Sequence, residues 1–139
     1  MTETSIEKAL YERFMTLNEF SGTSYITKEN IAFPNVSFEP PQNKRWFELF
    51  VLSDSPNSVG IGEEAQNRWN GIFQINICTP LDKGVKESNA KYEWIAKLFK
   101  RGTCFGDVEI NKVYKATEVA ADDCFKTVVR IEWTATIDN

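Results

Sequence analysis

The sequence predicts an α+β fold in which a mostly antiparallel sheet packs against two helices. Two segments place apolar residues three or four positions apart, which is the spacing of one helical face. The remaining apolar segments are short, and most alternate apolar with polar residues, as strands do. Because the strands follow one another in groups, antiparallel pairing is expected. We expect a single domain over residues 1–139, a length that supports one hydrophobic core.

The first helix is predicted over residues 4–20. Its apolar residues share one helical face and are Ile6, Leu10, Phe14, Leu17 and Phe20. Thr4 and Glu7 fit a capping box, in which two side chains accept hydrogen bonds from amides of the first turn. Gly22 suits the left-handed residue that follows a helix. The sequence therefore marks both ends of this helix.

A polar connection with three prolines follows the first helix, over residues 23–44. It can support only short extended pieces, near Ile31–Phe33 and Val36–Phe38, so we expect an edge strand or an ordered connection. The next strand, Arg45–Ser53, is apolar on both of its alternating faces. That pattern predicts a strand covered on both sides.

A long polar loop is predicted over Ser53–Asn67, and a strand with one polar side follows it over Trp69–Cys78. A turn over Leu81–Glu87 then leads into the second helix, which ends at Gly102. The apolar face of this helix is marked by Val85, Tyr92, Ile95, Ala96 and Phe99.

Three strands complete the predicted fold. They are short over Thr103–Phe105, longer over Val108–Thr117, and clearest over Cys124–Ile137. The last strand would span roughly 40 Å at about 3.3 Å per residue. Few small domains need a strand of this length.

The composition excludes several classes of protein. The formal charge of −4 and the pI near 5.0 argue against a tight nucleic-acid binder, which needs a basic excess. No apolar run reaches the roughly 20 residues of a membrane span, and the polar start does not resemble a signal peptide. We therefore expect a soluble protein made in a cytoplasm.

No catalytic, cofactor or metal site is predicted. The chain has no histidine, which removes the commonest general base and the commonest metal ligand. The adjacent acids Glu63–Glu64 and Asp122–Asp123 are interpreted as solvated turn residues. The glycines of SVGIGEE lack the lysine of a phosphate-binding loop, and acids follow them.

The cysteines are Cys78, Cys104 and Cys124, and they form no CxxC pair. All three fall in apolar strand patterns, so buried, reduced thiols are expected. A disulfide between Cys104 and Cys124 across neighbouring strands stays open, although a cytoplasm normally keeps thiols reduced.

Charge is unevenly distributed along the chain. Residues 53–67 carry three acids and no base before Arg68, whereas residues 83–101 carry six basic residues and two acids. One interpretation is an ordinary solvated surface. The other is that the two segments meet between copies arranged head to tail. The candidate interface residues are Asp54, Glu63, Glu64 and Arg68 on one side, and Lys83, Lys86 and Trp94 on the other.

Trp94 is included because it lies off the main apolar stripe of its helix. A partly exposed contact is one interpretation of that position. Partial burial beside the sheet is the alternative.

The region Arg45–Gly102 resembles the tail terminator and tail-completion (minor tail) proteins of long-tailed bacteriophages, the siphophages, and of prophages. The resemblance is one of pattern. It rests on the aromatic strand opening at Trp46, the GIG-bearing loop, Arg68 with Gly71 and Ile72, the turn with Pro80 and Gly84, and the helix with Ala90, Ile95 and Phe99.

The resemblance implies a structural virion protein with a small α+β domain. Members of that family form a six-membered ring on the last ring of the tail tube, stop tube polymerisation and offer a surface to the head connector. The partners implied are other copies of the chain, the tail tube protein and head–tail connector proteins. DNA would pass through the lumen without specific binding, which suits an acidic chain. The implied location is the head-proximal end of the tail.

Three alternatives remain at this stage. The first is a head-to-tail connector or stopper, or another minor virion protein. The second is a small α+β protein-binding module unrelated to phages. An enzyme is the third and would need a site without histidine.

Overall fold

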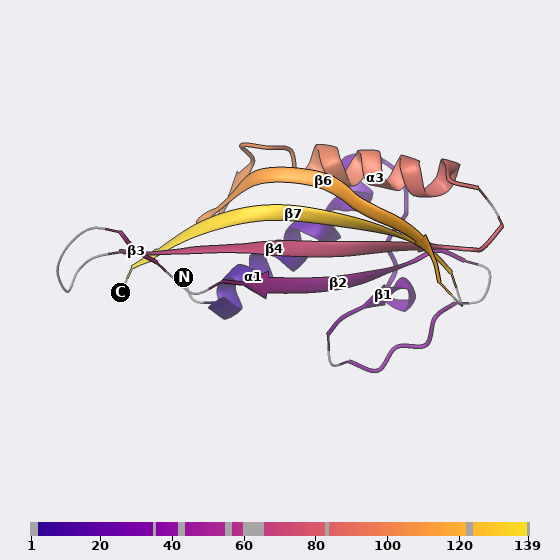
Figure 1. The fold of residues 1–139 in the computed structure, drawn as a ribbon, viewed down its shortest axis with the longest axis horizontal. Coiled ribbons are helices and arrows are strands. Elements are labelled where there is room, and N and C mark those ends of the chain that lie inside the picture. The colour runs from indigo at the N-terminus through magenta and orange to yellow at the C-terminus, as the bar shows by residue number, and fades with distance from the viewer. Residues whose placement is uncertain are drawn as a thin grey trace.

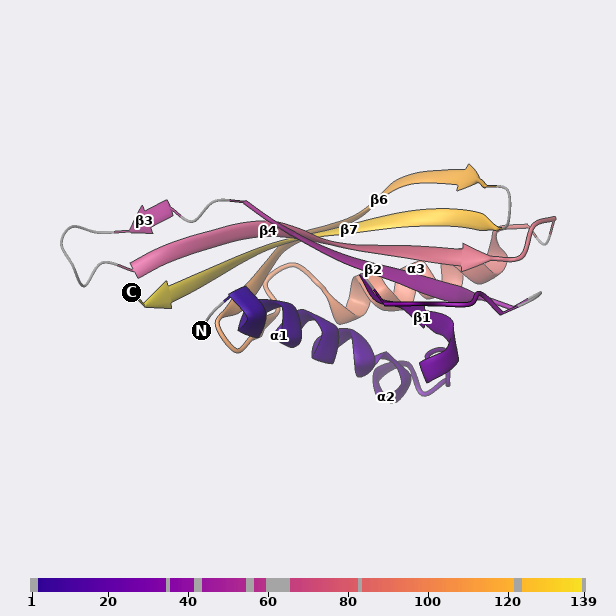
Figure 2. The same cartoon turned by 90° about the horizontal axis from the view of Figure 1, so that it is seen from below.

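The computed structural model describes residues 3–34, 36–41, 44–54, 57–59, 66–82, 84–121 and 124–138. These residues form one curved sheet with the helices on one of its faces (Figures 1 and 2). The seven strands have the order β1-β2-β4-β7-β6-β5, and β3 pairs with β4 outside that path. The predicted α+β fold, with a mostly antiparallel sheet packed against helices, is confirmed.

The helices are α1 (Glu3–Met15), α2 (Leu17–Ser21) and α3 (Lys86–Leu98), with a short 3-10 turn η1 at Lys28–Asn30. The strands are β1 (Ile31–Ala32), β2 (Trp46–Ser53), β3 (Asn57–Val59), β4 (Gln66–Thr79), β5 (Cys104–Phe105), β6 (Val108–Ala120) and β7 (Phe125–Asp138). β4 lies between β2 and β7 and pairs with β7 along its whole length. β1 pairs with β2 and is parallel to it.

The core lies between the sheet and the helices. Alternate residues of β2, β4 and β7 point toward the helices and are buried, as the period of two predicts. Aromatic rings join the layers edge to face: Phe14 of α1 meets Phe47 of β2 at 5.5 Å between centroids, and Phe73 of β4 meets Phe99 at 5.7 Å. Most of the predicted apolar residues of the helices lie in this core, but Phe20 and Val85 are exposed, contrary to the prediction. The buried face of α3 instead includes Ser88, Lys91 and Leu98 beside Ile95.

The first helix is interrupted at Thr16, where one continuous helix was predicted. The hydroxyl of Thr16 donates a hydrogen bond to the carbonyl oxygen of Arg13 at 2.6 Å. Such a bond competes with the helical ladder and commonly bends helices. Gly22 adopts the predicted left-handed conformation, with φ of +73°. The helix begins at Glu3, so Thr4 is already a helical residue and is not the capping residue that was predicted.

β2 is not covered on both sides, contrary to the prediction. Its outer face is buried only at Trp46, which packs against Phe38, Cys78 and Cys124. Farther along the strand, Leu52 is 57% exposed. The helices all lie on the inner face, and the connection after β1 reaches only the beginning of β2.

The long polar segment before β4 contains a strand that the sequence did not predict. Residues 57–59 of β3 pair with residues 66–68 of β4. The same residues of β4 pair with residues 136–138 of β7. We call these three short stretches the arm. In Figures 1 and 2 the arm extends the sheet beyond the beginning of α1.

β6 is an irregular outer strand. Its register against β7 shifts between Ile110 and Lys112 and again between Lys115 and Thr117, which marks two bulges. β5 pairs only with Val108 and Glu109 at its beginning. Most of β6 is therefore an edge of the sheet.

The cysteines differ from the prediction at one position. Cys78 and Cys124 are buried and contact each other, but Cys104 is exposed on β5. Cys104 pairs with Glu109 near the beginning of β6, whereas Cys124 follows the end of that strand. About 35 Å of strand separates the two, so Cys104 and Cys124 cannot form a disulfide in this fold.

Candidate functional site

The arm is a three-stranded ribbon that the described helices leave uncovered (Figure 2). Short ribbons of this kind are stable in water only when a hydrophobic face packs against something else. Within the chain it is tied to the domain through β4 and β7, whose pairing continues without a break from residue 66 to residue 79. The arm is thus a projecting element held in place from one end.

Two of the predicted interface residues lie at the base of the arm. Arg68 is exposed on β4 and pairs with Asn57 of β3. Asp54 is exposed at the end of β2, and its backbone N–H donates to the carbonyl oxygen of Asn70 at 2.8 Å. The structure therefore brings Asp54 and Arg68 into one region. Glu63 and Glu64 lie outside the described residues, in the connection between β3 and β4.

A cleft of about 570 Å³ lies at the opposite end of the sheet, where β2 begins and β4 ends. Its walls come from the turn before β1, from the segment before β2 and from the beginning of α3, all at the end opposite β3 in Figure 1. The lining residues are Thr27, Glu29, Asn30, Pro41, Lys44, Arg45, Pro80 and Glu87.

An ionic cluster forms one wall of this cleft. The carboxylate of Glu87 lies 3.4 Å from the guanidinium of Arg45 and 3.2 Å from the ammonium of Lys91. Both cations also face the ring of Tyr25, with Arg45 at 5.6 Å and Lys91 at 4.5 Å from its centroid. Arg45 additionally donates to the carbonyl oxygen of Ser24 at 3.2 Å.

Lys91 is the buried member of the cluster, with only 4% of its side chain exposed. Burial lowers its pKa from the usual lysine range, and the carboxylate of Glu87 opposes that shift. Two cations share one carboxylate, so the group of Arg45, Lys91 and Glu87 carries one net positive charge. The sequence analysis did not find this cluster, although Lys91 falls in line with the buried residues Ser88, Ile95 and Leu98 of α3.

The second set of predicted interface residues is on or near α3. Lys86 is exposed at the first residue of the helix, close to the cleft. Trp94 is half-buried: its ring meets Phe20 edge to face at 5.9 Å, and the ammonium of Lys97 lies 4.7 Å above it. Trp94 therefore joins α2 to α3. Lys83 lies outside the described residues.

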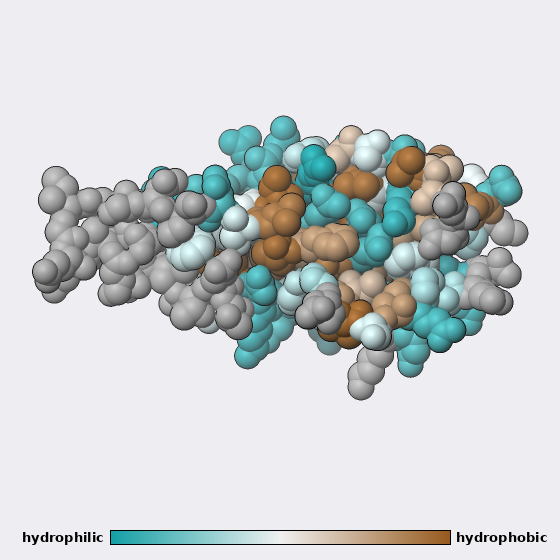
Figure 3. All heavy atoms as spheres, turned by 60° about the horizontal axis from the view of Figure 1, so that its bottom comes forward, coloured by the Kyte–Doolittle hydropathy of each residue, from teal (hydrophilic) through white to brown (hydrophobic). Residues whose placement is uncertain are grey.

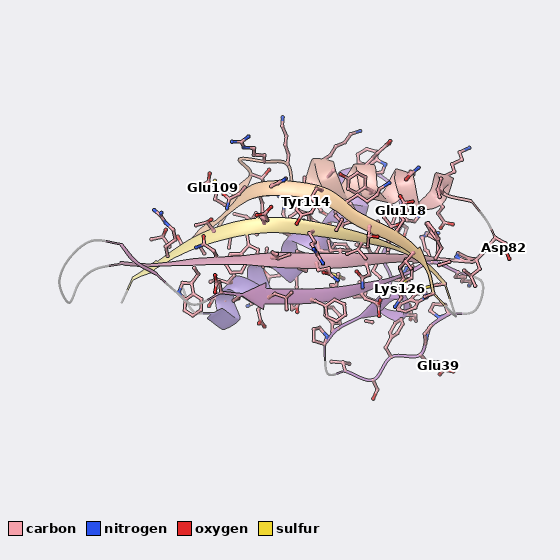
Figure 4. The ribbon with its side chains drawn as sticks, viewed as in Figure 1. Glu39, Asp82, Glu109, Tyr114, Glu118 and Lys126 are labelled. Carbon is pink, nitrogen blue, oxygen red and sulfur yellow. The ribbon has the colours of Figure 1, made fainter. Side chains whose placement is uncertain are left out.

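The outer face of the sheet carries a ladder of polar side chains. The carboxylate of Glu48 accepts a hydrogen bond from Asn76 at 3.1 Å and pairs with Lys126 at 3.1 Å. Gln74 continues the ladder, donating to Asn76 at 3.1 Å and accepting from Arg130 at 3.3 Å. Figure 4 labels Lys126 and Tyr114 on this face, which none of the described helices covers.

Apolar residues are also exposed on the molecule. Figure 3 shows them among hydrophilic side chains across the middle of the surface turned to the viewer. Leu52 pairs with Ile72 in the ladder between β2 and β4, and both line a shallow depression with Asn70 and Glu132. The outer face is thus mixed in character, without one dominant charge.

The described residues offer neither a metal cluster nor a membrane-spanning helix. Within the part of the chain that the structure describes, no group of three cysteine, aspartate or glutamate residues is placed to hold a metal ion. None of the described helices combines the length and the apolar character needed to cross a membrane.

The family of the chain follows from its sequence match. The family model described as phage tail terminator protein matches residues 5–133, which include both helical regions and the strands up to Trp133 of β7. The chain belongs to the phage tail terminator family. This family consists of structural proteins of the phage tail, which places the chain in the virion tail and in contact with other tail and head-connector proteins. The resemblance seen in the sequence is confirmed.

Solved structures share the fold of this tail terminator. One of them superimposes with a TM-score of 0.64 at 18% sequence identity, and the match covers 99% of this chain and 96% of the other. At that identity the likeness concerns the fold. No curated protein matches the chain.

Proposed function

We propose that this tail terminator forms a closed ring, six-membered in the family's manner, on the last ring of the tail tube. The ring stops tube polymerisation and offers its other side to the head connector, and the phage is a siphophage or a related prophage. The family membership of residues 5–133 carries this proposal. DNA passes through the lumen of the ring without specific binding.

The arm supports the ring part of the proposal. A cyclic assembly needs two different patches on each copy, because every copy contacts its two neighbours through different surfaces. The arm projects at one end of the sheet, and the cleft and the beginning of α3 lie at the other. The described helices of a copy do not cover its own arm. A neighbouring copy can therefore cover it.

The candidate interface residues fit the same arrangement. Arg68 belongs to the arm and Asp54 lies beside it, while Lys86 lies at the opposite end. Glu63 and Glu64 belong to the sequence that joins β3 to β4. We place Lys83 and Trp94 on the second patch as well. Opposite charges on facing patches favour one orientation of neighbouring copies.

The outer face of the sheet is compatible with contact with the tube or the connector. Its side chains already satisfy one another through the ladder of Glu48, Asn76, Gln74 and Arg130. Such a surface can pack against a polar partner while most of its hydrogen-bonding groups stay satisfied.

The first experiment measures the mass of the purified protein by light scattering over a range of concentration and salt, followed by negative-stain imaging with tail tube protein. Rings, or tubes that stop at a defined cap, support the proposal. Tubes that continue to grow unchanged contradict it. Binding to connector protein in place of the tube would assign the chain to the stopper role, and a monomer without effect on either would favour a binding module.

A charge reversal tests the acidic segment. The double variant Glu63→Lys and Glu64→Lys should assemble more weakly than the wild type while keeping its thermal unfolding midpoint. The matched control reverses Glu19 to lysine, because Glu19 is an exposed acid of α2 that neither belongs to the arm nor lines the cleft. Ring formation that is unchanged in the double variant would remove the segment from the interface.

A further inference from the structure

We infer that Cys78 and Cys124 are a redox pair, joined by a disulfide in oxidising surroundings and present as two thiols in reducing ones. Cys78 lies near the end of β4, and Cys124 directly precedes β7. Because β3 pairs with the beginning of β4, the pair lies at the opposite end of the sheet (Figure 1). The inference does not depend on ring formation, and it adds a covalent link that the proposed function does not require.

The first argument is that the two thiols are already in contact. Cys78 is directly opposite Lys126, and Cys124 comes two residues before Lys126, so both thiols lie on the outer face of the sheet. They share a hydrogen bond and belong to one buried cluster. Diagonal neighbours in a sheet lie about 7–8 Å apart between α-carbons, slightly beyond the usual reach of a disulfide. Cys124 lies outside the ladder that fixes Phe125 against Thr79, so a small shift of its backbone closes the gap.

The second argument is the burial of the pair. Cys78 and Cys124 are both almost completely buried. Trp46 covers them, and Phe38 packs on Trp46 with 5.3 Å between the ring centroids. The third thiol, Cys104, is exposed on β5, near the beginning of β6 and far from the pair. Each buried thiol therefore has only the other within reach, and a disulfide between them would be shielded from reducing agents.

The third argument is that the surroundings of Cys78 can take up its proton. Its thiol donates a hydrogen bond to the carboxylate of Glu48 at 3.7 Å, and the ammonium of Lys126, labelled in Figure 4, lies 3.1 Å from the same carboxylate. Glu48 can accept the proton when the thiolate forms, and Lys126 offsets the new negative charge. Burial still raises the pKa of Cys78, so the thiolate is rare and oxidation is slow at neutral pH.

A low-molecular-weight disulfide such as oxidised glutathione supplies the oxidant. One cysteine thiolate attacks a sulfur of this disulfide when Trp46 moves aside, the S–S bond of the oxidant breaks, and one glutathione thiolate leaves. The other cysteine then attacks the mixed disulfide, the bond between Cys78 and Cys124 forms, and the second glutathione leaves. Overall the two protein thiols lose two electrons and two protons, which are recovered in two molecules of reduced glutathione.

The disulfide ties the end of β4 to the beginning of β7 and encloses α3, β5 and β6 in one covalent loop. Such a loop restricts the unfolded chain and thereby stabilises the folded one. The family places the chain in the virion tail. Virion surfaces are oxidising surroundings in which disulfides persist, whereas a cytosol keeps thiols reduced. The bond therefore strengthens the protein after the virion has left the cell.

Oxidation of the purified protein tests the inference. The Cys104→Ser variant, which lacks the exposed thiol, is incubated with oxidised glutathione at mildly alkaline pH. Mass spectrometry of the intact chain should show the loss of two hydrogen atoms and no added glutathione, and no thiol should react with maleimide after denaturation. The thermal unfolding midpoint should rise by about 5–15 °C and should return to its starting value when dithiothreitol is added.

The matched control carries Cys124→Ser in addition, which leaves Cys78 without its partner. Its unfolding midpoint should be the same after oxidation and after reduction. Each comparison is made between the oxidised and reduced forms of one variant, so any loss of stability caused by the serine itself cancels.

Several results would overturn the inference. They are two free thiols after prolonged oxidation just below the unfolding midpoint, a glutathione adduct that persists on either cysteine, covalent dimers, and an internal disulfide that lowers the midpoint. None of these results concerns ring formation or the capping of tubes. The proposed function therefore stands or falls by its own experiment.

Discussion

Gly71 of β4 lies directly opposite Trp133 of β7, and the indole of Trp133 lies where a side chain at Gly71 would be. A β-carbon built at Gly71 would be 2.5 Å from Cζ2 of Trp133 and would also collide with the carbonyl oxygen of Leu52. Trp133 is 1% exposed, so it cannot move aside without disturbing the core. This glycine is required by the packing of its neighbour.

Gly71→Ala should therefore lower the free energy of unfolding by about 2–3 kcal/mol, as overpacking in a filled core does. Urea denaturation measures the loss. The comparison variant is Gly84→Ala, where no atom lies within 4 Å of the new carbon but φ is +73°. That change should cost only about 1 kcal/mol, through the backbone alone. Equal costs at the two positions would contradict the steric explanation.

Glu87→Gln should destabilise the fold because it leaves the buried ammonium of Lys91 without its carboxylate. The carboxylate is 38% exposed, so solvent screens part of the interaction and we expect a loss of about 1–2 kcal/mol. Glu93→Gln on the exposed face of the same helix should stay within about 0.5 kcal/mol of the wild type. Thermal and urea unfolding of both variants would show whether the cluster is structural.

Cys78 should make the protein lose stability in alkali. Burial raises the pKa of its thiol far above the ordinary value of 9.0, and the thiol of Cys124 and the carboxylate of Glu48 add to the shift. Above pH 9 the unfolded chain releases the proton and the folded chain keeps it. Stability is therefore fully present below pH 9 and falls by up to about 1.4 kcal/mol per pH unit above it.

Unfolding free energies at pH 8, 9 and 10 for the wild type and for Cys78→Ala measure this contribution as a difference of slopes. The slope should be shallower in Cys78→Ala and unchanged in Cys104→Ala, where the thiol is exposed. A parallel fall in the wild type and Cys78→Ala would show that other groups cause the alkaline loss.

Thiol labelling should distinguish the cysteines. A maleimide should modify Cys104 rapidly in the folded protein and reach Cys78 and Cys124 only after unfolding, since buried thiols are inert. Mass spectrometry should then show one label on the native chain and three on the denatured chain. Two or more labels on the native chain would mean that the end of the sheet around Trp46 opens readily.

Trp94 and Lys86 should respond differently to substitution, although both were expected at an interface. Trp94→Ala removes the contact with Phe20 that joins α2 to α3 and should cost about 1–3 kcal/mol of stability. Lys86→Glu changes an exposed residue and should leave stability unaltered while weakening assembly. Measuring the free energy of unfolding and the extent of ring formation for each variant distinguishes a residue that packs within the chain from one that contacts another copy.

The sequence was informative wherever a periodic pattern covered a whole element. The alternation in β4 and β7 and the helical stripe ending at Phe99 predicted the sheet and its covering helix, because side-chain direction follows backbone geometry. β3 was missed since Asn57–Val59 is short and carries no pattern of its own; its pairing with β4 defines it. The outer face of β2 was misjudged because apolar composition does not show whether another layer exists to cover it.

The candidate sites were less predictable for a related reason. The sequence shows which residues are charged, but it does not show which of them lie close together in space. The acidic and basic segments could therefore be identified, whereas the cluster of Arg45, Glu87 and Lys91 could not. These three residues come from segments more than 40 positions apart, joined only by the fold. The cleft likewise depends on the meeting of Thr27, Pro80 and Glu87, which no local pattern encodes.

The two bulges of β6 have a consequence for the behaviour of the free protein. Fibres grow by edge-to-edge pairing of sheets from different copies. Each copy then needs two regular edge strands, because it pairs with a neighbour on each side. The register shifts at Ile110/Lys112 and Lys115/Thr117 remove one of these edges. Edge-to-edge growth of the free protein into fibres through β6 is therefore disfavoured by the shape of this strand.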